Sequence, residues 1–469
     1  MLPPHGEWRL PPGLKRSLPF YANQPWVKLG RPILLFEHLH RTYGNVAHYR
    51  FMGTPIIFVN DPEYIREILV TQASAFVKER TVRRMKILLG DGLITSEEPF
   101  HMRQRRIAAP AFHRQRIAAY ASQIVESAVT ASDRIVSGQP FDISAASMEL
   151  SLEIVARTLF NTKVDAAIRS INDDTNAIME LYNFIVAFPR IERFLHWPIP
   201  KITKFRRAKA RLDSVVDNLV REHREAMARG EADNGDLLSM LLSSHIDVLD
   251  EAGNPTGQVE TMSDIQVRDE VLTIFLAGYE TVANGIAWTW YLLSQNPDAE
   301  ARLHAELDAV LGTGASRRLP TLADYASLRY TEQVFGESMR LFPPAWAMGR
   351  MSTRPVTLGP WRIPAGAHFF MSQYMMSRTP EFYPDPLRFD PDRFTPEAKA
   401  ARPKFAYFPF GGGSRQCIGE AFAWMEGAFS IATLAQRWRF RYANSTPPIP
   451  RARITLRPRD PLMMIAEAR

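Results

Sequence analysis

Phe408-Pro-Phe-Gly-Gly-Gly-Ser-Arg-Gln-Cys-Ile-Gly419 is the stretch that decides the fold, because it contains the only cysteine of the chain, Cys417. The residues after it, Glu420–Arg437, have the apolar spacing of an amphipathic helix. Cys417 is therefore predicted to lie at a helix N-terminus, where the helix dipole and free backbone N–H groups stabilise a thiolate.

The residues around Cys417 are suited to a flat ligand. Gly411 and the two glycines after it let the backbone turn tightly, and Gly419 leaves room against the first turn of the helix. Arg415 can pair with an anionic group on such a ligand. Two other interpretations compete: a lone cysteine is usually a small buried apolar residue, and a glycine-rich loop can cradle a phosphate. The second lacks support, because no Lys-Ser/Thr follows the glycines.

The spacing Phe410-x-x-Gly413-x-Arg415-x-Cys417-x-Gly419 resembles the haem-ligand pattern of the cytochrome P-450 family. The resemblance implies a mainly α fold with small β-sheets (α+β) and a long central helix over the haem. It also implies that haem b is the cofactor and that Cys417 is its axial thiolate ligand. Phe410, Gly411, Arg415 and Gly419 would then contact the cofactor.

The longest predicted helix is Ser263–Gln295, which begins with the capping-box spacing Ser263-x-x-Gln266 and stops at Asn296-Pro297. It is apolar on nearly all sides from Val271 to Leu293, which predicts a buried helix at the centre of the protein.

This helix contains Ala277-Gly278-Tyr279-Glu280-Thr281, in which an acid stands next to a threonine. A buried carboxylate without a partner is costly, so Glu280 needs a partner, water or a function. The pattern resembles the oxygen-binding groove of the family. That resemblance implies space for O2 at Ala277 and Gly278, a hydrogen bond from Thr281 and a proton relay through Glu280. The family often has a second hydroxyl residue where this chain has Val282.

Three further motifs agree with the resemblance. Glu337-x-x-Arg340, followed by Arg393 in Pro391-Asp-Arg-Phe394, is similar to the buried charge network of the family. His101-x-x-x-Arg105 takes the place of the family's Trp-x-x-x-Arg, which binds a haem propionate, and His101 keeps an N–H donor. A basic, solvated helix face is the alternative for this pair. Arg350 matches an arginine on a strand that also contacts a propionate.

The pocket for the substrate is predicted from apolar segments. The resemblance suggests Phe275, Trp346, Met348 and Met463, together with the loop around Met85–Leu93 and the segment Tyr182–Phe188. For each of these the alternative is an ordinary place in the core. The apolar lining indicates a fatty acid, terpenoid or steroid.

Composition limits the remaining possibilities. The 469 residues are 46% hydrophobic and 23% charged, which excludes disordered, collagen-like and coiled-coil classes. One cysteine excludes intramolecular disulfides and multi-cysteine metal sites. The 57 Lys and Arg residues against 50 Asp and Glu give a net charge of +7, which is weak evidence for nucleic acid. The N-terminal residues contain neither a membrane span nor a secretory signal. We expect a cytoplasmic monomer without a nucleic-acid partner or a transmembrane anchor.

The expected organisation is a Pro-rich surface tail over residues 1–25 and a single domain over residues 26–469. The other expected elements are a β-hairpin of Asn45–Phe51 and Pro55–Val59, helices over Asp61–Thr71, His101–Ala111 and Gln115–Ser137, and polar loops over Arg229–Asp236 and Asp247–Gln258.

The resemblance implies a monooxygenase that uses O2 and receives electrons from a separate ferredoxin or flavodoxin with its NAD(P)H reductase. The sequence has no dinucleotide-binding fingerprint that would let the chain reduce itself. A peroxide-driven peroxygenase or a haem-thiolate isomerase needs no electron partner, but such enzymes commonly lose the acid–threonine pair. A haem-based sensor is the third possibility, and it would need an output domain or a regulatory tail, which this sequence lacks.

Overall fold

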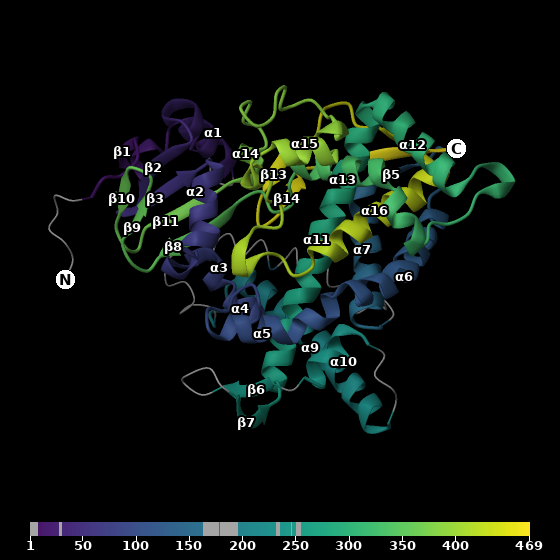
Figure 1. Ribbon diagram of the computed structural model, residues 1–469, viewed down its shortest axis with the longest axis horizontal. Helices are drawn as coiled ribbons and strands as arrows, with labels where there is room; N and C mark the ends of the chain where they lie inside the picture. The colour runs from purple at the N-terminus through teal and green to yellow at the C-terminus, as the bar shows by residue number, and fades with distance from the viewer. Residues whose placement is uncertain are drawn as a thin grey trace.

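The computed structural model (Figure 1) describes residues 8–27, 31–162, 178, 196–230, 235–244, 246–249 and 255–469. Its helices are α1 (Pro32–Tyr43), α2 (Pro62–Arg66), α3 (Arg80–Arg84), α4 (Lys86–Leu89), α5 (Phe100–Ala108), α6 (Arg114–Asp133), α7 (Ile143–Leu159), α9 (Pro200–Ala228), α10 (Leu237–Leu242), α11 (Asp264–Gln295), α12 (Pro297–Leu311), α13 (Arg329–Leu341), α14 (Gln373–Met376), α15 (Pro396–Ala401) and α16 (Glu420–Arg437). The fold is mainly helical with small sheets, as predicted.

The strands are β1 (Gly13–Ser17), β2 (Val46–Phe51), β3 (Thr54–Val59), β4 (Phe76–Lys78), β5 (Pro140–Asp142), β6 (Ile246–Leu249), β7 (Pro255–Glu260), β8 (Met348–Ser352), β9 (Val356–Leu358), β10 (Trp361–Ile363), β11 (His368–Met371), β12 (Trp438–Tyr442), β13 (Pro450–Ala452), β14 (Leu456–Pro458) and β15 (Met463–Ala468). The largest sheet has the order β1-β2-β3-β11-β8-β4, and a second has the order β12-β15-β5. The largest sheet lies at one side of the molecule, and α11 runs through the helical part (Figure 1).

Helix α11 begins and ends where the sequence predicts. The side chain of Ser263 accepts a hydrogen bond from the backbone of Gln266, and the side chain of Gln266 accepts one from the backbone of Ser263 at 2.7 Å. Trp288 is fully buried, and Gly285 lies so close to Phe335 of α13 that a Cβ there would be 2.9 Å from the ring. The helix is therefore closely packed from Val282 to Trp290.

Its composition alone would allow α11 to cross a membrane. Among the described residues it is the one helix long and apolar enough to do so, and 83% of its most apolar window is buried inside the fold. Contacts with α7, α9, α13 and α16 cover this surface. The apolar character of α11 is thus explained by its place in the core.

Three sequence-based expectations need correction. Within the predicted surface tail, Gly13–Ser17 forms β1 parallel to β2, and the burial of Leu14 explains why this segment joins the sheet. The predicted loop Asp247–Gln258 contributes to the antiparallel pair β6–β7. Its Gly- and Asp-rich composition is as typical of a hairpin turn as of a loop.

The predicted helix Asp61–Thr71 is interrupted. Asp61 caps α2 by accepting a hydrogen bond from the backbone of Tyr64 at 3.0 Å, but residues Glu67–Thr71 form a wider π-helical turn. This turn brings the carbonyl of Leu69 against Gly413 of the cysteine loop. The predicted hairpin is present as β2 and β3, and the other predicted helices differ from α5 and α6 by a few residues at their ends.

Candidate functional site

The cysteine loop folds back on itself immediately before α16. The backbone N–H of Cys417 donates to the carbonyl of Phe410, and that of Gly411 donates to the carbonyl of Phe408, both at 2.9 Å. Gly411 and Gly413 have φ values of +74° and +71°, in the left-handed region that favours glycine. The predicted tight turn is present, and two of its glycines are needed for their backbone angles.

Close packing adds a second requirement at Gly413. A Cβ there would be 2.0 Å from the carbonyl oxygen of Leu69, which no side chain can tolerate. By contrast, a Cβ at Gly419 would meet only Phe112, at 3.7 Å. Gly419 is the N-cap of α16 and leaves open space beside the first turn, as expected for a flat ligand.

Cys417 is exposed to solvent. Protein atoms nevertheless surround its sulfur closely enough that desolvation raises the pKa of the thiol, and the negative charge of Glu420 acts in the same direction. The N–H of Gly419 and the charge of Arg105 lower this pKa but do not compensate. The predicted stabilisation by the helix N-terminus is therefore present and is outweighed by desolvation.

Basic side chains from three segments converge near this loop. Lys78 on β4 stands opposite Arg350 on β8 in the sheet. Its Nζ is buried and donates to the carbonyls of Leu93 and Ser96, each at 2.6 Å. Burial, followed by the charges of Arg415 and Arg350, lowers the pKa of Lys78 to about 7. These cations are close enough to destabilise one another.

Two carboxylates lie among these cations. Arg415 donates to Glu97 at 2.5 Å and has Glu98 at 3.8 Å, while His101 contacts Glu98 at 2.9 Å. Burial and neighbouring positive charges lower the pKa of His101 to about 4, so its ring is neutral. Burial and the charge of Arg415 lower the pKa of Arg350 to about 10. The cluster lacks enough negative charge for its cations, which favours an anionic ligand.

Arg105, the partner of His101 in the predicted motif, lies on the same helix. It donates to the carbonyl of Gln416 at 2.7 Å, one residue before Cys417. The structure thus places His101, Arg105, Arg350 and Arg415 around the cysteine loop. Arg415, expected to pair with a ligand, already has a protein partner in Glu97.

Glu280 and Thr281 are adjacent on α11 but have different partners. The hydroxyl of Thr281 donates to the carbonyl of Ala277 at 2.9 Å. The carboxylate of Glu280 is buried and accepts from Arg457, whose Nη2 lies at 2.7 Å, and from the hydroxyl of Thr455. The acid expected to relay protons is held by the residues at the start of β14.

Gly278 has a packing role. A Cβ at this position would lie 3.2 Å from the side chain of Val155 on α7. Its small size therefore allows α7 and α11 to approach, and the space for O2 expected at this position stays a prediction. Ala277 is partly accessible, as is Thr281.

The predicted charge network is assembled. Arg340 donates to both oxygens of Glu337, at 2.6 and 2.8 Å, and both side chains are fully buried. The Nε of Arg393 lies 3.6 Å from Glu337, and its Nη2 donates to the carbonyl of Pro384 at 2.6 Å. Glu337 also accepts from the backbone of Asp390 at 2.8 Å. The carboxylate therefore fastens α13 to the loop that carries Arg393.

The residues suggested for a substrate pocket do not form one group. Phe275 is buried in the helical core, with its ring centroid 5.4 Å from that of Phe160. Met348 is the first residue of β8 and lies beside Gly411 of the cysteine loop. Only Met348 of these two adjoins the site. Tyr182–Phe188 lies outside the described residues.

Trp346 and Met463, the other two residues suggested for the pocket, have contacts of their own elsewhere in the fold. The Nε1 of Trp346 donates to the carbonyl of Arg453 at 2.7 Å, so this ring supports the turn between β13 and β14. Met463 pairs with Asp142 in the β12-β15-β5 sheet. The β13–β14 hairpin forms hydrogen bonds to α11 through Thr455, Leu456 and Arg457. The pocket role of Met463 stays a prediction.

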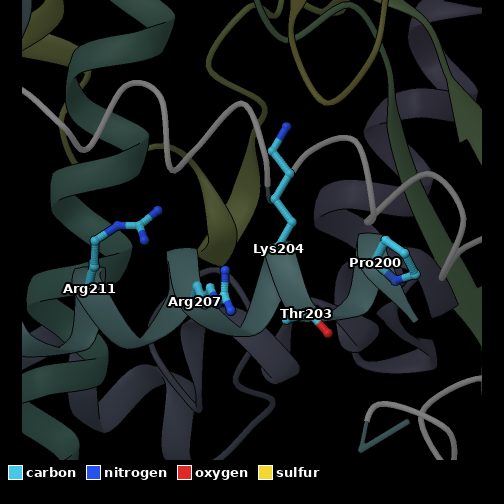
Figure 2. Close-up of a pocket in the computed structure, with 5 residues that line it drawn as sticks. All are labelled: Pro200, Thr203, Lys204, Arg207 and Arg211. Carbon is cyan, nitrogen blue, oxygen red and sulfur yellow. The ribbon is translucent and has the colours of Figure 1, made fainter. Parts of the chain in front are cut away.

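Figure 2 shows a cavity elsewhere, of about 440 Å³, along α9. Its lining is strongly basic and consists of Pro200, Thr203, Lys204, Arg207 and Arg211. None of these residues belongs to the cysteine loop, the cationic cluster or the acid–threonine pair. This cavity is therefore separate from the candidate site.

Sequence reasoning missed four residues of the site: Lys78, Glu97, Thr455 and Arg457. Lys78 reaches it through the pairing of β4 with β8, and Glu97 through its ion pair with Arg415. Thr455 and Arg457 meet Glu280 across 175 and 177 residues of chain. Neither Thr455 nor Arg457 belongs to a sequence motif, so no local pattern predicts their contacts with Glu280.

Comparisons with known proteins agree with this geometry. A family model described as cytochrome P450 matches residues 11–465. Cyclooctatin synthase from Streptomyces melanosporofaciens is 36% identical over 91% of this chain and 89% of its own length. Cyclooctat-9-en-7-ol 5-monooxygenase from the same organism is 35% identical over 89% of this chain and 86% of its own. Pentalenene oxygenase from Streptomyces avermitilis is 31% identical over 89% of each.

The fold is also found among solved structures. The crystal structure of the cytochrome P450DA heme domain superposes with a TM-score of 0.81 over 98% of each chain, at 22% sequence identity.

Proposed function

Because the chain belongs to the cytochrome P450 family, it is a monooxygenase, and we propose that it uses haem b, held by Cys417, to place one oxygen atom of O2 into a terpenoid. The family implies haem with a cysteine thiolate ligand. The observation that carries the assignment is the exposed residue Cys417 beside a cationic cluster that lacks negative charge.

The residues present fit such a group. Haem b carries two carboxylates, and the lowered pKa values of Lys78 and Arg350 are those of cations that two further negative charges would stabilise. Arg350, with Arg105 and Arg415, would hold these carboxylates, whereas the single N–H of the neutral His101 is already donated to Glu98. Cys417 would bind the iron, whose positive charge would favour the thiolate form. When bound, haem with a thiolate ligand supplies the oxidation and favours O–O cleavage.

The protein residues would control protons and access to the site. Thr281, at the partly accessible face of α11, has a hydroxyl that can donate a hydrogen bond to a ligand when it leaves the carbonyl of Ala277. Glu280 is the acid that would supply protons to it, from the side on which Arg457 meets solvent. Ala277 is the small residue that would leave room for O2. Phe410 would pack against the ligand from the loop.

The names of relatives support the proposed substrate class. One relative is named for an oxygenase of pentalenene and another for a 5-monooxygenase of cyclooctat-9-en-7-ol, and both cover nearly the whole chain. We therefore favour a polycyclic terpenoid over a fatty acid or a steroid. Electrons would come from a separate ferredoxin or flavodoxin with its NAD(P)H reductase. The cytoplasmic location and the monomeric state stay predictions.

Two experiments test this function. The purified protein, supplied with haemin, should give the red-shifted carbonyl spectrum of thiolate ligation, and Cys417→Ser should abolish it. With a surrogate ferredoxin, its reductase and NADPH, the protein should convert pentalenene or cyclooctat-9-en-7-ol to a product heavier by one oxygen atom. Conversion driven only by hydrogen peroxide would favour a peroxygenase. Ligand binding without any turnover of a broader terpenoid panel would favour a sensor.

A further inference from the structure

The carboxylate of Glu280 is held through one of its two oxygens. Oε1 accepts from the hydroxyl of Thr455, from Nε of Arg457 at 2.8 Å, and lies 2.7 Å from Nη2 of the same arginine. Oε2 has no hydrogen bond within the part of the chain that the structure describes. It is not among the fully buried oxygens that lack a partner, so it keeps some accessible surface. The two oxygens therefore have different surroundings.

The segment that supplies these donors is itself fixed. Leu456, between Thr455 and Arg457, is fully buried, and its N–H donates to the carbonyl of Pro344 at 2.9 Å. Its carbonyl accepts from Nε1 of Trp288 at 3.2 Å. Both backbone groups between the two donors are thus bound, so the position of the donors is set by the fold rather than by flexible side chains alone.

This arrangement also reaches solvent. The side chain of Arg457 is 19% exposed, whereas that of Glu280 is 6% exposed. Asn284, one turn further along α11, donates to the carbonyl of Glu280 at 2.8 Å and stands 3.5 Å from the hydroxyl of Thr455. Glu280 lies at the inner end of a short polar path whose outer end is Arg457.

We propose that Arg457 and Thr455 are positioning residues for Glu280: they anchor Oε1 so that Oε2 is presented as the oxygen that takes up and passes on protons. The proposal rests on the proposed role of Glu280 in the monooxygenase. For each of the two protons that a turnover consumes, Oε2 gains one proton from solvent and gives one to the site, so the carboxylate returns to its starting state. A buried glutamate without this anchor has several rotamers, and most of them misplace Oε2.

The variants that test this proposal change residues of the β13–β14 hairpin. Arg457→Met removes the cation and keeps much of the apolar stem, Thr455→Val removes only the hydroxyl, and Arg457→Lys is the conservative rescue. Arg451→Met is the matched control, because Arg451 is exposed and pairs directly with Arg457 across the same hairpin. Glu280→Gln gives the full loss of the acid.

The first measurement is coupling, the amount of product formed per NADPH consumed, with cyclooctat-9-en-7-ol, a surrogate ferredoxin and its reductase. General acid catalysis contributes about 10²-fold or more, so Glu280→Gln should lose about that factor. Arg457→Met should lose about tenfold, with a matching rise in hydrogen peroxide and a larger solvent deuterium isotope effect. Arg457→Lys should recover most of the loss, and Arg451→Met should match the wild type.

The second measurement needs no turnover. In infrared difference spectra referenced to Glu280→Gln, the band of the Glu280 carboxyl group should shift in Arg457→Met and Thr455→Val and stay in place in Arg451→Met. The carbonyl spectrum and urea unfolding check that each variant binds haem and folds.

Wild-type coupling and isotope effects in Arg457→Met and Thr455→Val, or an unchanged carboxyl band, would overturn the positioning role. A wild-type protein that forms no product with any terpenoid would instead contradict the proposed function. If Arg457→Met does not fold, Thr455→Val carries the test, because it removes no charge and little volume.

Discussion

Glu270, three turns before Thr281 on α11, should make the stability of this protein fall as pH rises. Its side chain is 1% exposed. One carboxyl oxygen accepts from the backbone of Leu93 at 3.1 Å, and the other is buried without a hydrogen-bond partner among the described residues. Burial, with a contribution from the charge of Asp269, raises the pKa of Glu270 from 4.5 to about 8.

The direction and size of the effect follow from this shift. Between pH 4.5 and about 8 the folded protein keeps a proton on Glu270 that the unfolded chain has lost. Stability therefore falls across this window by about 1.4 kcal/mol per pH unit, which amounts to about 5 kcal/mol at pH 8 and above. Glu270→Gln keeps the shape of the neutral acid and cannot ionise, so it should remove this loss.

The assay is urea unfolding, followed by tryptophan fluorescence, at several pH values between 5 and 9. The free energy of unfolding of Glu270→Gln minus that of the wild type should be near zero at pH 5 and should grow with pH, reaching several kcal/mol by pH 8. Glu149→Gln is the control, since the side chain of Glu149 is 67% exposed. A difference that stays constant from pH 5 to pH 9 would refute the reasoning.

Two other predictions concern the charge network and the cysteine loop. Arg393→Met leaves the buried carboxylate of Glu337 with one cationic partner fewer, which should lower the free energy of unfolding by about 3–5 kcal/mol; urea unfolding measures it, and a loss below about 1 kcal/mol would show that Arg340 suffices. Gly413→Ala should destabilise much more than Gly138→Ala, because both glycines have positive φ but only Gly413 would clash with Leu69. Gly138→Ala should cost about 1–2 kcal/mol, and equal losses in the two variants would mean that the loop relaxes.

Features set by neighbours along the chain could be predicted from the sequence. The capping box and the stop at Asn296-Pro297 fix the ends of α11, and both involve residues within a few positions of each other. The same holds for the turn at Gly411, whose positive φ follows from the glycine itself. The β2–β3 hairpin could also be predicted from such local signals.

Contacts across the fold could not be predicted in this way. Glu280 was recognised as a buried acid that needs a partner, but its partner lies 177 residues away on β14. The proximity of Lys78 to Arg350 depends on the register between β4 and β8. Phe275 was expected at the substrate from the family resemblance, with a place in the core as the alternative, and its apolar character alone does not distinguish the two.

The order in which the chain is made gives the burial of α11 a further consequence. Its last residue is Gln295, whereas α13, α16 and the β13–β14 hairpin that cover it are completed only by Pro458. At a ribosomal rate of 5–20 residues per second, roughly 10–30 s separate the two events. For that time the nascent chain carries a long apolar helix that only the earlier elements, such as α7 and α9, can cover, and such a partly covered segment is the kind that holding chaperones and the membrane-insertion machinery bind. The yield of folded protein should therefore depend on how quickly translation delivers the last third of the sequence.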